Sequence, residues 1–318
     1  MKFFVAGCGR WGSFIAWYLN SIGHKVTLYG RESSEKMKEL KESRRSGVLT
    51  LPESIELVTD LSSLADCDSA VISIGSQQLS SFLSEVVTLA PKNKTFILCM
   101  KGIEIDTGRR LSEIAEEYLG SDNSIAVWLG PGHPEDFSKG RPNCMVIDSR
   151  DDATKRMLVS ELSSSLIRFY YGTDLIGNEV GAAAKNVVGI AAGILDGLGI
   201  SSLKGALMAR GPREISRLVT AMGGDAVSVY GLCHLGDYEA TVFSQYSHNR
   251  AFGEAVVRGE EFSALAEGYY TVRALLSLGE RYGVDLPICR AVYAIVYDKK
   301  DALTEIEALF ARSVKYEF

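Results

Sequence analysis

The sequence predicts an α/β protein with a doubly wound parallel sheet in its N-terminal part and an all-helical C-terminal domain. In the first part, short β-branched or aromatic runs alternate with helix-length segments, which is the pattern of βαβ units. Three of these runs are nearly continuous in apolar residues, as expected of parallel strands that are buried on both faces. Beyond about residue 173, strand-like runs disappear and apolar residues recur at helical spacing.

The expected strands of the first domain are the apolar runs themselves. They cover residues 2–6, 25–29, 70–74, 95–99 and 125–129, and two further runs at 144–148 and 167–171 resemble additional strands. Between the first five lie segments 10–22, 35–43, 77–89 and 107–119, which are long enough for the crossovers that parallel strands require. In the second domain, helical spacing is clearest at 214–222, 270–282 and 290–297. We therefore expect a sheet domain at residues 1–173 and a helical domain at residues 174–318.

The composition is that of an ordinary globular protein and excludes several classes. Of 318 residues, 46% are hydrophobic and 23% are charged, which excludes a disordered or fibrous chain. The 34 Lys and Arg against 40 Asp and Glu give a net charge of −6 without a concentrated basic stretch, so nucleic acid is not an expected partner. The six cysteines are dispersed without metal-ligand spacing, so we expect buried thiols and no metal site.

No segment predicts a membrane span or a signal peptide. The longest apolar run, residues 180–195, is interrupted by Lys185 and Asn186 and is too short to cross a bilayer. The apolar N-terminus reaches a glycine-rich turn at Gly7, without the apolar region and cleavage site of a signal peptide. We therefore expect a cytoplasmic protein.

A glycine motif follows the first expected strand directly. Gly7, Gly9 and Gly12 form the pattern GxGxxG, which also contains Arg10 and Trp11, and a helix-patterned segment continues from it. In a Rossmann-type fold, the first glycine permits a tight turn, the second lets the backbone approach a pyrophosphate, and the third lets the helix pack on the strand. The motif alone is weak evidence, but its strand-to-helix position favours a dinucleotide site over an incidental glycine turn.

The end of the second expected strand bears on the choice of coenzyme. An NAD site places an Asp or Glu there to bind the ribose 2′-hydroxyl, whereas this chain has Tyr29, Gly30 and Arg31. Gly30 has no side chain, and the planar cation of Arg31 suits a 2′-phosphate, so the sequence favours NADP over NAD. The alternative is that Arg31 is a solvated loop residue paired with Glu32 or Glu35.

Three further segments follow strand ends, at the edge where ligands bind in open α/β sheets. They are residues 74–77, 100–104 and 129–135. In the second of them, the ammonium group of Lys101 could hold an anionic substrate. Most such lysines are surface residues, and it is the neighbouring loops that favour the functional interpretation.

Lys185 lies in an apolar helical segment, residues 181–189, and small residues flank it at three- and four-residue spacings. An ammonium group in such a stretch must reach water, find an anion or lose its proton. The last would make Lys185 a general acid or base with a lowered pKa. A buried ion pair is the alternative. Downstream, the polar segments 234–237 and 247–253 each resemble a loop when taken alone.

Taken in order, these motifs resemble the NAD(P)H-dependent glycerol-3-phosphate dehydrogenases of the bacterial type. The resemblance covers nearly the whole chain, and several ordered motifs are far more specific than any one of them. Besides the GxGxxG turn with Trp11, it rests on Lys101-Gly102-Ile103-Glu104, Gly130-Pro131, Lys185-Asn186-Val187, Arg210-Gly211, Leu235-Gly236-Asp237, Asn249-Arg250, Phe252-Gly253 and Glu267-Gly268-Tyr269.

The resemblance implies reversible reduction of dihydroxyacetone phosphate to sn-glycerol 3-phosphate, for glycerophospholipid synthesis, by a homodimer that uses NADP or NAD. It implies that Lys185 is the catalytic proton donor and acceptor and that Asp237 orients its ammonium group. The implied substrate residues are Lys101, Gly130, Gly132, Lys185, Asp237, Ser247, His248 and Asn249. With the residues of the glycine motif and Arg31 included, the full set of predicted coenzyme residues is Gly7, Gly9, Arg10, Trp11, Gly12, Arg31, Lys101, Pro134, His248, Leu265 and Glu267.

Two departures from the family pattern bear on the substrate. Where the family usually has Arg between Ser and Asn, this chain has His248, which offers fewer donors, although Arg250 could compensate. After Gly130-Pro131 the family commonly continues with a small hydroxyl residue and Ala, whereas this chain has Gly132, His133 and Pro134, and the proline removes a backbone donor. One alternative is therefore a reductase of the same architecture for another 2-keto acid or phosphorylated ketone. A non-catalytic NADPH-binding regulator is a second alternative, which the presence of both Lys185 and Asp237 disfavours.

Overall fold

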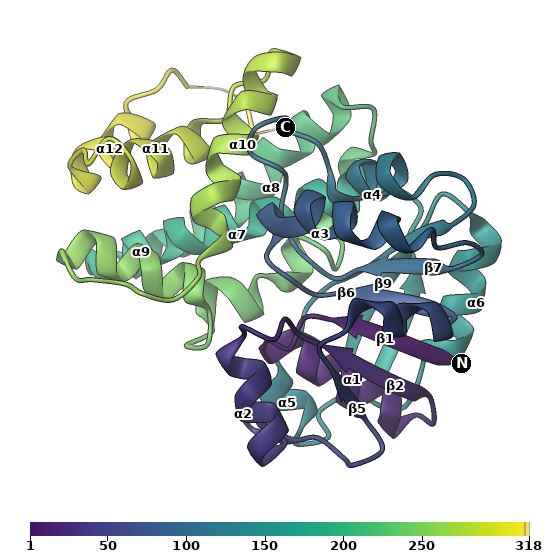
Figure 1. The fold of residues 1–318 in the computed structure, drawn as a ribbon. Coiled ribbons are helices and arrows are strands. Elements are labelled where there is room, and N and C mark those ends of the chain that lie inside the picture. The colour runs from purple at the N-terminus through teal and green to yellow at the C-terminus, as the bar shows by residue number, and fades with distance from the viewer. Residues whose placement is uncertain (315, 318) are drawn as a thin grey trace.

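The computed structural model describes residues 1–314, 316 and 317 and has the two parts that the sequence predicts (Figure 1). An eight-stranded sheet with flanking helices forms the N-terminal part. Helices form the C-terminal part, whose described residues contain no strand. The predicted fold class is confirmed.

The structure confirms all seven expected strands to within two residues. The strands are β1 (Lys2–Ala6), β2 (Lys25–Tyr29), β3 (Arg45–Ser46), β4 (Leu49–Thr50), β5 (Glu56–Val58), β6 (Ser69–Ile72), β7 (Thr95–Leu98), β8 (Ser124–Leu129), β9 (Asn143–Asp148) and β10 (Ile167–Tyr171). The sheet domain has helices α1 (Arg10–Ser21), α2 (Glu35–Ser43), α3 (Leu79–Val86), α4 (Leu111–Leu119), α5 (Pro134–Phe137) and α6 (Asp152–Leu162). The helical part has α7 (Leu175–Gly197), α8 (Lys204–Ala221), α9 (His248–Arg258), α10 (Glu267–Tyr282), α11 (Pro287–Val296) and α12 (Ala302–Phe310).

The strand order of the main sheet is β10-β9-β8-β7-β6-β1-β2-β5. The six strands from β8 to β5 in this order are parallel, as predicted. The sheet differs from the expectation at one edge, where β9 is antiparallel to β8 and β10 is parallel to β9. The chain returns from β8 to β9 through residues 130–142, whose helix α5 has only four residues, whereas a parallel crossover is usually made by a longer helix that runs along the sheet.

Strand β1 shows why the central strands are continuously apolar. Phe3 and Val5 pack in the same buried cluster as Phe14 of α1, whereas Phe4 packs in another buried cluster with Phe82 of α3. Alternate side chains therefore enter two separate cores, one on each face of the sheet. The carboxyl ends of the parallel strands are left as the edge at which ligand-binding loops gather.

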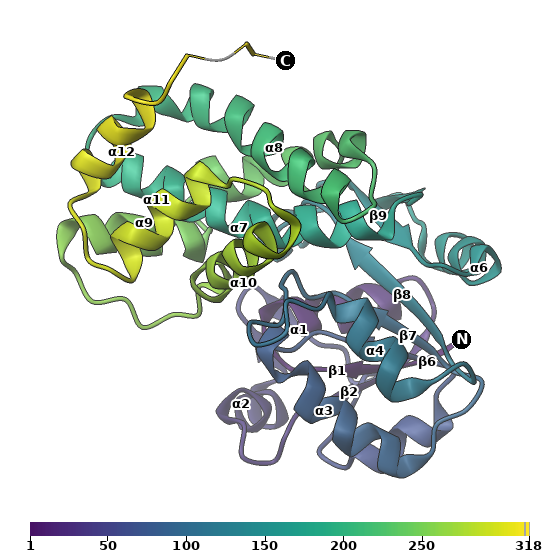
Figure 2. The same ribbon diagram turned by 90° about the horizontal axis from the view of Figure 1, so that it is seen from above.

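Helix α7 is the core of the helical part, and its residues from Gly177 to Leu195 are all buried. It is longer than the apolar run seen in the sequence and, by length and composition alone, could cross a membrane, but 89% of its most apolar window is buried inside the protein. A buried ion pair fixes its first turns to the sheet domain, with Arg110 Nη1 lying 2.7 Å from Glu179 Oε2. Figure 2 shows α8 and α12 on the side of the helical part away from the sheet.

Residues 247–253, expected as a loop, instead begin helix α9. The Ser247 hydroxyl accepts a hydrogen bond from the Arg250 N–H at 3.3 Å and so caps this helix. Helix α9 packs closely on α7 because glycines lie at the contact. A Cβ at Gly193 would lie 1.9 Å from the Arg250 carbonyl oxygen, and a Cβ at Gly253 would lie 2.1 Å from the Ile190 carbonyl oxygen. The glycines therefore set the distance between α9 and the helix that carries Lys185.

Substitution Gly193→Ala tests this close contact. We expect it to lower the free energy of unfolding by about 1–3 kcal/mol, because the added methyl group forces α7 and α9 apart. The matched control is Gly205→Ala on α8, where a Cβ meets no atom within 4 Å. That variant should be more stable by about 0.5–1 kcal/mol, since alanine has the better helix propensity. Urea unfolding of both variants measures the difference, and equal stabilities would contradict the role assigned to Gly193.

Candidate active site

The turn between β1 and α1 has the geometry that a dinucleotide phosphate requires. Gly7 has φ +113°, and a Cβ there would lie 2.1 Å from the Ser73 carbonyl oxygen, so only glycine fits. A Cβ at Gly12 would lie 1.9 Å from the Gly7 carbonyl oxygen, so this glycine allows the helix to pack on the strand. Gly9 has open space at its Cβ position and precedes α1 without a side-chain cap. Backbone N–H groups of the first helical turn can therefore bind an anion there.

Arg10 joins this turn to the loop after β8. Arg10 Nη2 lies 3.0 Å from Glu135 Oε2 and 3.2 Å from His133 Nδ1, while His133 Nε2 lies 3.1 Å from the Ala240 carbonyl oxygen in the helical part. Because arginine can only donate, this pattern fits a neutral His133 with its proton on Nε2. Burial lowers the pKa of His133, which agrees with that state. Trp11 is partly buried among aromatic rings of the same region.

The end of β2 holds Gly30 and Arg31. A Cβ at Gly30 would lie 2.7 Å from Cys8 Sγ and 2.8 Å from Met37 Cε, so a larger side chain at this position requires both of these side chains to shift. Arg31 is half exposed, and its Nη2 lies 3.2 Å from Glu85 Oε1. Arg31 therefore pairs with a residue of α3, and with neither Glu32 nor Glu35, the two partners considered from the sequence.

Two lysines from different domains share one carboxylate oxygen. Lys185 Nζ on α7 lies 3.0 Å from Asp237 Oδ2, and Lys101 Nζ, after β7, lies 2.6 Å from the same oxygen. Lys101 Nζ also donates to the Gly130 carbonyl oxygen at 2.7 Å. Lys185 Nζ donates to Thr241 Oγ1 at 2.7 Å. We call these five residues the lysine cluster.

Thr241 was missed by the sequence reasoning. It lies four residues after Asp237, and its hydroxyl donates to the Asp237 carbonyl oxygen at 2.7 Å. The spacing of about one helical turn between Asp237 and Thr241 is the sequence feature that could have indicated their contact. The segment Glu239–Phe243, however, forms a π-helical turn, which has no clear sequence pattern.

The lysine cluster is buried, and burial changes its proton affinity. The Lys185 and Asp237 side chains are 10% and 1% exposed. Burial lowers the pKa of Lys185 to about 8, and the Asp237 carboxylate opposes this shift. Asp237 Oδ1 is buried and has no hydrogen-bond partner within the described part of the chain. Because a buried polar atom without a partner is destabilising, this oxygen suits a hydroxyl group of a bound substrate.

Two asparagines connect the lysine helix to its neighbours. Asn186 Nδ2 donates to the Lys101 carbonyl oxygen at 3.0 Å, and Asn186 Oδ1 accepts from Asn249 Nδ2 at 3.1 Å. Asn249 Oδ1 accepts from the Gly268 N–H at 2.8 Å. The predicted substrate residue Asn249 therefore bridges α7, α9 and α10, and Asn186 is a second residue that the sequence reasoning left without a role.

Three further predicted coenzyme residues, Glu267, His248 and Leu265, also lie outside the lysine cluster. The Glu267 carboxylate accepts a hydrogen bond from the Ser76 hydroxyl at 2.6 Å, so it lies beside the loop after β6. His248 is exposed, and its Nδ1 lies 3.3 Å from the carbonyl oxygen of Leu265, whose side chain is also exposed. The coenzyme roles of these residues stay predictions.

Known proteins are similar to this chain in both sequence and fold. Models of the N-terminal and C-terminal parts of NAD-dependent glycerol-3-phosphate dehydrogenase match residues 2–155 and 174–307. The chain belongs to the NAD-dependent glycerol-3-phosphate dehydrogenase family. Relatives named glycerol-3-phosphate dehydrogenase (NAD(P)+) from Pelodictyon phaeoclathratiforme and Thermotoga sp. are 35% and 36% identical to it, over 100% of this chain and 99% of their own length. Membership confirms the resemblance and the class, an NAD(P)-dependent oxidoreductase, so the non-catalytic alternative is not retained.

Solved structures agree with this membership. The crystal structure of glycerol-3-phosphate dehydrogenase from Coxiella burnetii has a TM-score of 0.91 and 27% identity, and the match covers 98% of this chain and 99% of that chain. D-mandelate dehydrogenase, with a TM-score of 0.65 and 17% identity over 95% of this chain and 100% of its own, shares the fold alone.

The loop after β8 departs from the family pattern for a structural reason. Gly132 has φ +153°, and a Cβ there would lie 2.4 Å from a ring carbon of Phe137. The hydroxyl side chain that the family commonly has at this point therefore does not fit beside this phenylalanine. Pro134 is buried and begins α5, where its missing N–H costs no helical hydrogen bond.

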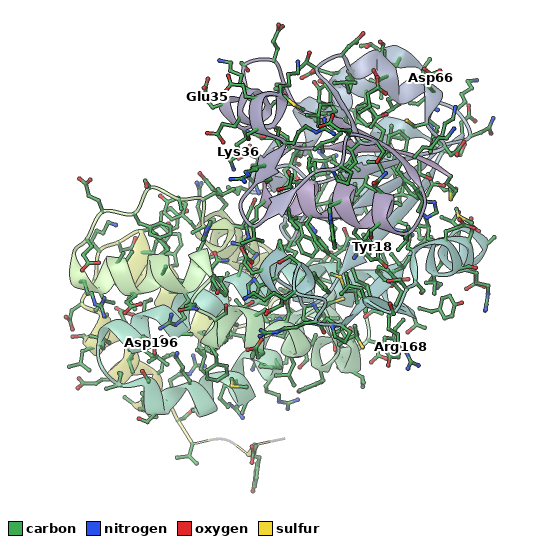
Figure 3. All side chains as sticks on the ribbon, turned by 90° about the horizontal axis from the view of Figure 1, so that it is seen from below. Tyr18, Glu35, Lys36, Asp66, Arg168 and Asp196 are labelled. Atoms are coloured by element: carbon green, nitrogen blue, oxygen red, sulfur yellow. The ribbon has the colours of Figure 1, made fainter. Side chains whose placement is uncertain are left out.

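Arg250 does not compensate for His248, contrary to the possibility raised from the sequence. Arg250 Nε lies 2.6 Å from Asp196 Oδ2, and Lys204 Nζ lies 2.6 Å from the same oxygen. Figure 3 shows Asp196 among the helices of the C-terminal part, away from the sheet. The guanidinium group common in the family thus has no replacement from Arg250.

His234 lies on the same segment as Asp237 and is fully buried. Its Nδ1 lies 2.8 Å from the Gly181 carbonyl oxygen, and its Nε2 lies 2.7 Å from the Tyr238 hydroxyl. A neutral ring satisfies both contacts by donating from Nδ1 and accepting at Nε2. Burial lowers the pKa of His234 to about 4.

The free energy of unfolding should therefore fall as the pH decreases from about 6.5 to about 4. The unfolded chain protonates His234 near pH 6.5, whereas the folded chain does so only near pH 4, and this difference contributes up to about 3 kcal/mol. Substitution His234→Gln should reduce the pH dependence measured by chemical denaturation at pH 7, 6, 5 and 4. The exposed His248→Gln serves as the control and should leave it unchanged. A His234→Gln slope equal to the wild-type slope would contradict the prediction.

Proposed function

We propose that this protein catalyses the reversible NAD(P)H-dependent reduction of dihydroxyacetone phosphate to sn-glycerol 3-phosphate. The proposal rests on Lys185, whose buried ammonium group contacts Asp237 and Thr241 and has its pKa lowered to about 8. Such a group exchanges a proton near neutral pH, which is what interconversion of a carbonyl and an alcohol requires.

The lysine cluster suits a small anionic ketone. Lys101 and Lys185 carry two positive charges against the single charge of Asp237, so the cluster attracts an anion when both lysines are protonated. Asp237 Oδ1 is placed to accept a hydrogen bond from a substrate hydroxyl, because it has no partner among the described residues. Lys101 is 20% exposed and can turn toward the phosphate while the buried Lys185 stays in place.

In the proposed reduction, Lys185 Nζ gives a proton to the carbonyl oxygen as that oxygen gains negative charge. Thr241 and Asp237 hold this ammonium group in one orientation and stabilise it until the proton leaves. When bound, the reduced coenzyme supplies the hydride that the carbonyl carbon gains. In the reverse direction, neutral Lys185 accepts the hydroxyl proton. Besides Gly132 in the loop after β8, the remaining predicted substrate residues are Ser247, His248 and Asn249. These three lie at the N-terminal turn of α9, which Asn186 ties to α7.

We also infer a preference for NADPH, binding at the turn that contains Gly7, Gly9 and Gly12. The preference is supported by Gly30, which offers no carboxylate to a ribose 2′-hydroxyl, and by the half-exposed Arg31, which can exchange Glu85 for a 2′-phosphate. The cytoplasmic location expected from the sequence and the homodimer implied by the family resemblance are both kept as proposals.

A reductase of another phosphorylated ketone or 2-keto acid is the second candidate. It is favoured by the absence of the family's guanidinium group at His248 and by the engagement of Arg250 with Asp196. Following NADPH absorbance with dihydroxyacetone phosphate and a panel of such ketones decides between the candidates. Turnover of a rival substrate, with dihydroxyacetone phosphate inert, would replace the proposed function.

Substitution Lys185→Ala should lower kcat by about 10²–10⁴-fold and leave NADPH affinity nearly unchanged, because the change removes the proton donor only. In the wild type, kcat/KM for reduction should fall as the pH rises through about 8, since the protonated lysine is the active form. For oxidation of glycerol 3-phosphate the sign is opposite, and kcat/KM should rise through about pH 8. The exposed Lys92→Ala is the control. Near-normal turnover of Lys185→Ala would remove the proposed proton transfer.

Substitution Arg31→Ala tests the coenzyme preference. Loss of a charged hydrogen bond worth about 1.5–3 kcal/mol should weaken NADPH binding roughly tenfold or more and should leave NADH binding unchanged. Arg45→Ala, which removes an exposed arginine from the same domain, is the matched control. Fluorescence titration with both coenzymes gives the affinities. A wild-type protein that binds NADH more tightly than NADPH would refute the assignment.

A further inference from the structure

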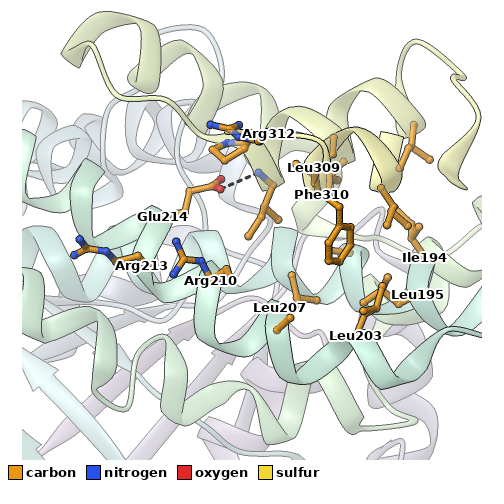
Figure 4. A pocket seen from close by; sticks show the side chains of 18 of the residues that line it. Ile194, Leu195, Leu203, Leu207, Arg210, Arg213, Glu214, Leu309, Phe310 and Arg312 are labelled. Carbon is orange, nitrogen blue, oxygen red and sulfur yellow. Dashed lines mark hydrogen bonds between the residues drawn. The ribbon is translucent and has the colours of Figure 1, made fainter. Parts of the chain in front are cut away.

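A cavity of about 500 Å³ lies in the helical part (Figure 4), and no residue of the lysine cluster lines it. It forms where α7, α8, α11 and α12 face one another, and core side chains such as Ile194, Leu207 and Ile295 line it. This volume is within the range of about 300–1,000 Å³ that is typical of small-molecule sites. Nothing in the proposed reaction uses it.

One end of this cavity is cationic. Arg210, Arg213 and Arg217 are spaced by three and four residues on α8 and so share one face of the helix, and Arg312 lines the cavity after α12. Figure 4 shows the division along the cavity, with Arg210, Arg213 and Arg312 toward one end and Ile194, Leu195 and Leu203 toward the other. In a chain of net charge −6, this concentration of positive charge is a local feature.

Glu214, an acidic residue that lines the cavity near these arginines (Figure 4), has another role. The Glu214 carboxylate accepts the N–H groups of Ile288 and Cys289 at 2.8 and 3.0 Å and so caps the start of α11. Glu214 is buried, and burial raises the pKa of its carboxyl group. Its acceptor atoms are therefore turned to the backbone of α11 and do not face outward to pair with the arginines.

Two of the four arginines are available for a ligand. Arg312 Nη2 lies 2.5 Å from Asp285 Oδ2, and Arg217 Nη2 donates to the Asp285 carbonyl oxygen at 2.7 Å. Arg210 and Arg213 make no ion pair with any residue that the structure describes. Arg210 makes one long contact, 3.5 Å, to the carbonyl oxygen of Glu317.

We propose that this cavity binds an anionic amphiphile, with a single alkyl chain against the apolar lining and a carboxylate or phosphate headgroup at Arg210 and Arg213. Guanidinium groups bind both headgroups through paired hydrogen bonds. Binding of the alkyl chain is favourable because it removes apolar surface of both the chain and the cavity from water. The charge complementarity at one end selects this ligand class over an uncharged apolar molecule. The site is independent of the proposed reductase function, although α7 forms part of both.

Calorimetric titration of the full chain with dodecyl phosphate, below its micelle concentration, tests the proposal. We expect one saturable site per chain, competition by dodecanoate, and at least tenfold weaker binding of uncharged dodecanol. Octyl phosphate should bind more weakly by roughly fourfold for each methylene group that the cavity no longer buries. Dodecyl phosphate and dodecanoate also separate phosphate from carboxylate as the preferred headgroup.

Substitutions in the cavity test whether dodecyl phosphate binds there. The double substitution Arg210→Gln and Arg213→Gln should weaken dodecyl phosphate binding at least tenfold. The control is Arg141→Gln with Arg150→Gln, two arginines of the sheet domain that are 66% and 65% exposed, and it should bind as the wild type does. A second blocking variant, Ala206→Phe, places a ring at an exposed position of the lining without a change of charge and should weaken binding of both anions.

The proposal is overturned if dodecanol binds as tightly as dodecyl phosphate or if the Arg210 and Arg213 variant binds normally. It is also overturned if sedimentation shows that a second copy of the chain covers this face and excludes dodecyl phosphate. NADPH oxidation with dihydroxyacetone phosphate is measured on the same samples. A protein that binds dodecyl phosphate but reduces no ketone would refute the proposed function and support this inference. A protein that reduces dihydroxyacetone phosphate but does not bind dodecyl phosphate would support the proposed function and refute this inference.

Discussion

The burial of one ammonium group, that of Lys185, is the constraint on which the site depends. Removing a charge from water is costly, and the structure offsets that cost with the Asp237 carboxylate and the Thr241 hydroxyl. The two effects act in opposite directions on the pKa, and burial is the larger of them, so the pKa falls to about 8. A surface lysine with the same neighbours in sequence would stay protonated over the whole physiological range.

A proton donor is useful only when it is held in place, and three contacts fix α7. The ion pair between Arg110 and Glu179 ties its first turns to the sheet domain. The hydrogen bond from Asn186 to the Lys101 carbonyl oxygen joins its middle to the end of β7. Close packing at Gly193 brings α9 against its last turns. Lys185 thus projects from a helix that is braced on both sides, so the proposed proton transfer would start from an ammonium group that is already held in place.

One position in the helical part, His248, separates this chain from the family pattern. At the N-terminal turn of α9 an imidazole, His248, stands where the family usually has a guanidinium group, and Arg250 points instead to Asp196. Positive charge is gathered elsewhere, on the face of α8 that carries Arg210 and Arg213. Because Arg250 and Lys204 both pair with Asp196, these two cations serve the packing of the helices and leave Lys101 and Lys185 as the cations of the lysine cluster.

The sequence by itself determined the fold class, the strand positions and the glycine turn, because these depend on local patterns: apolar runs, helical spacing and the order of glycines. It also singled out Lys185, since a lysine in an apolar helix is unusual without any knowledge of its partners. Only the tertiary structure decided that β9 runs antiparallel, that Thr241 and His133 join the site, and that Arg250 turns away from it. Each of these depends on contacts between residues far apart in the chain or on an irregular turn. A one-dimensional pattern carries little information about such contacts, because the direction of a side chain follows from the packing around it.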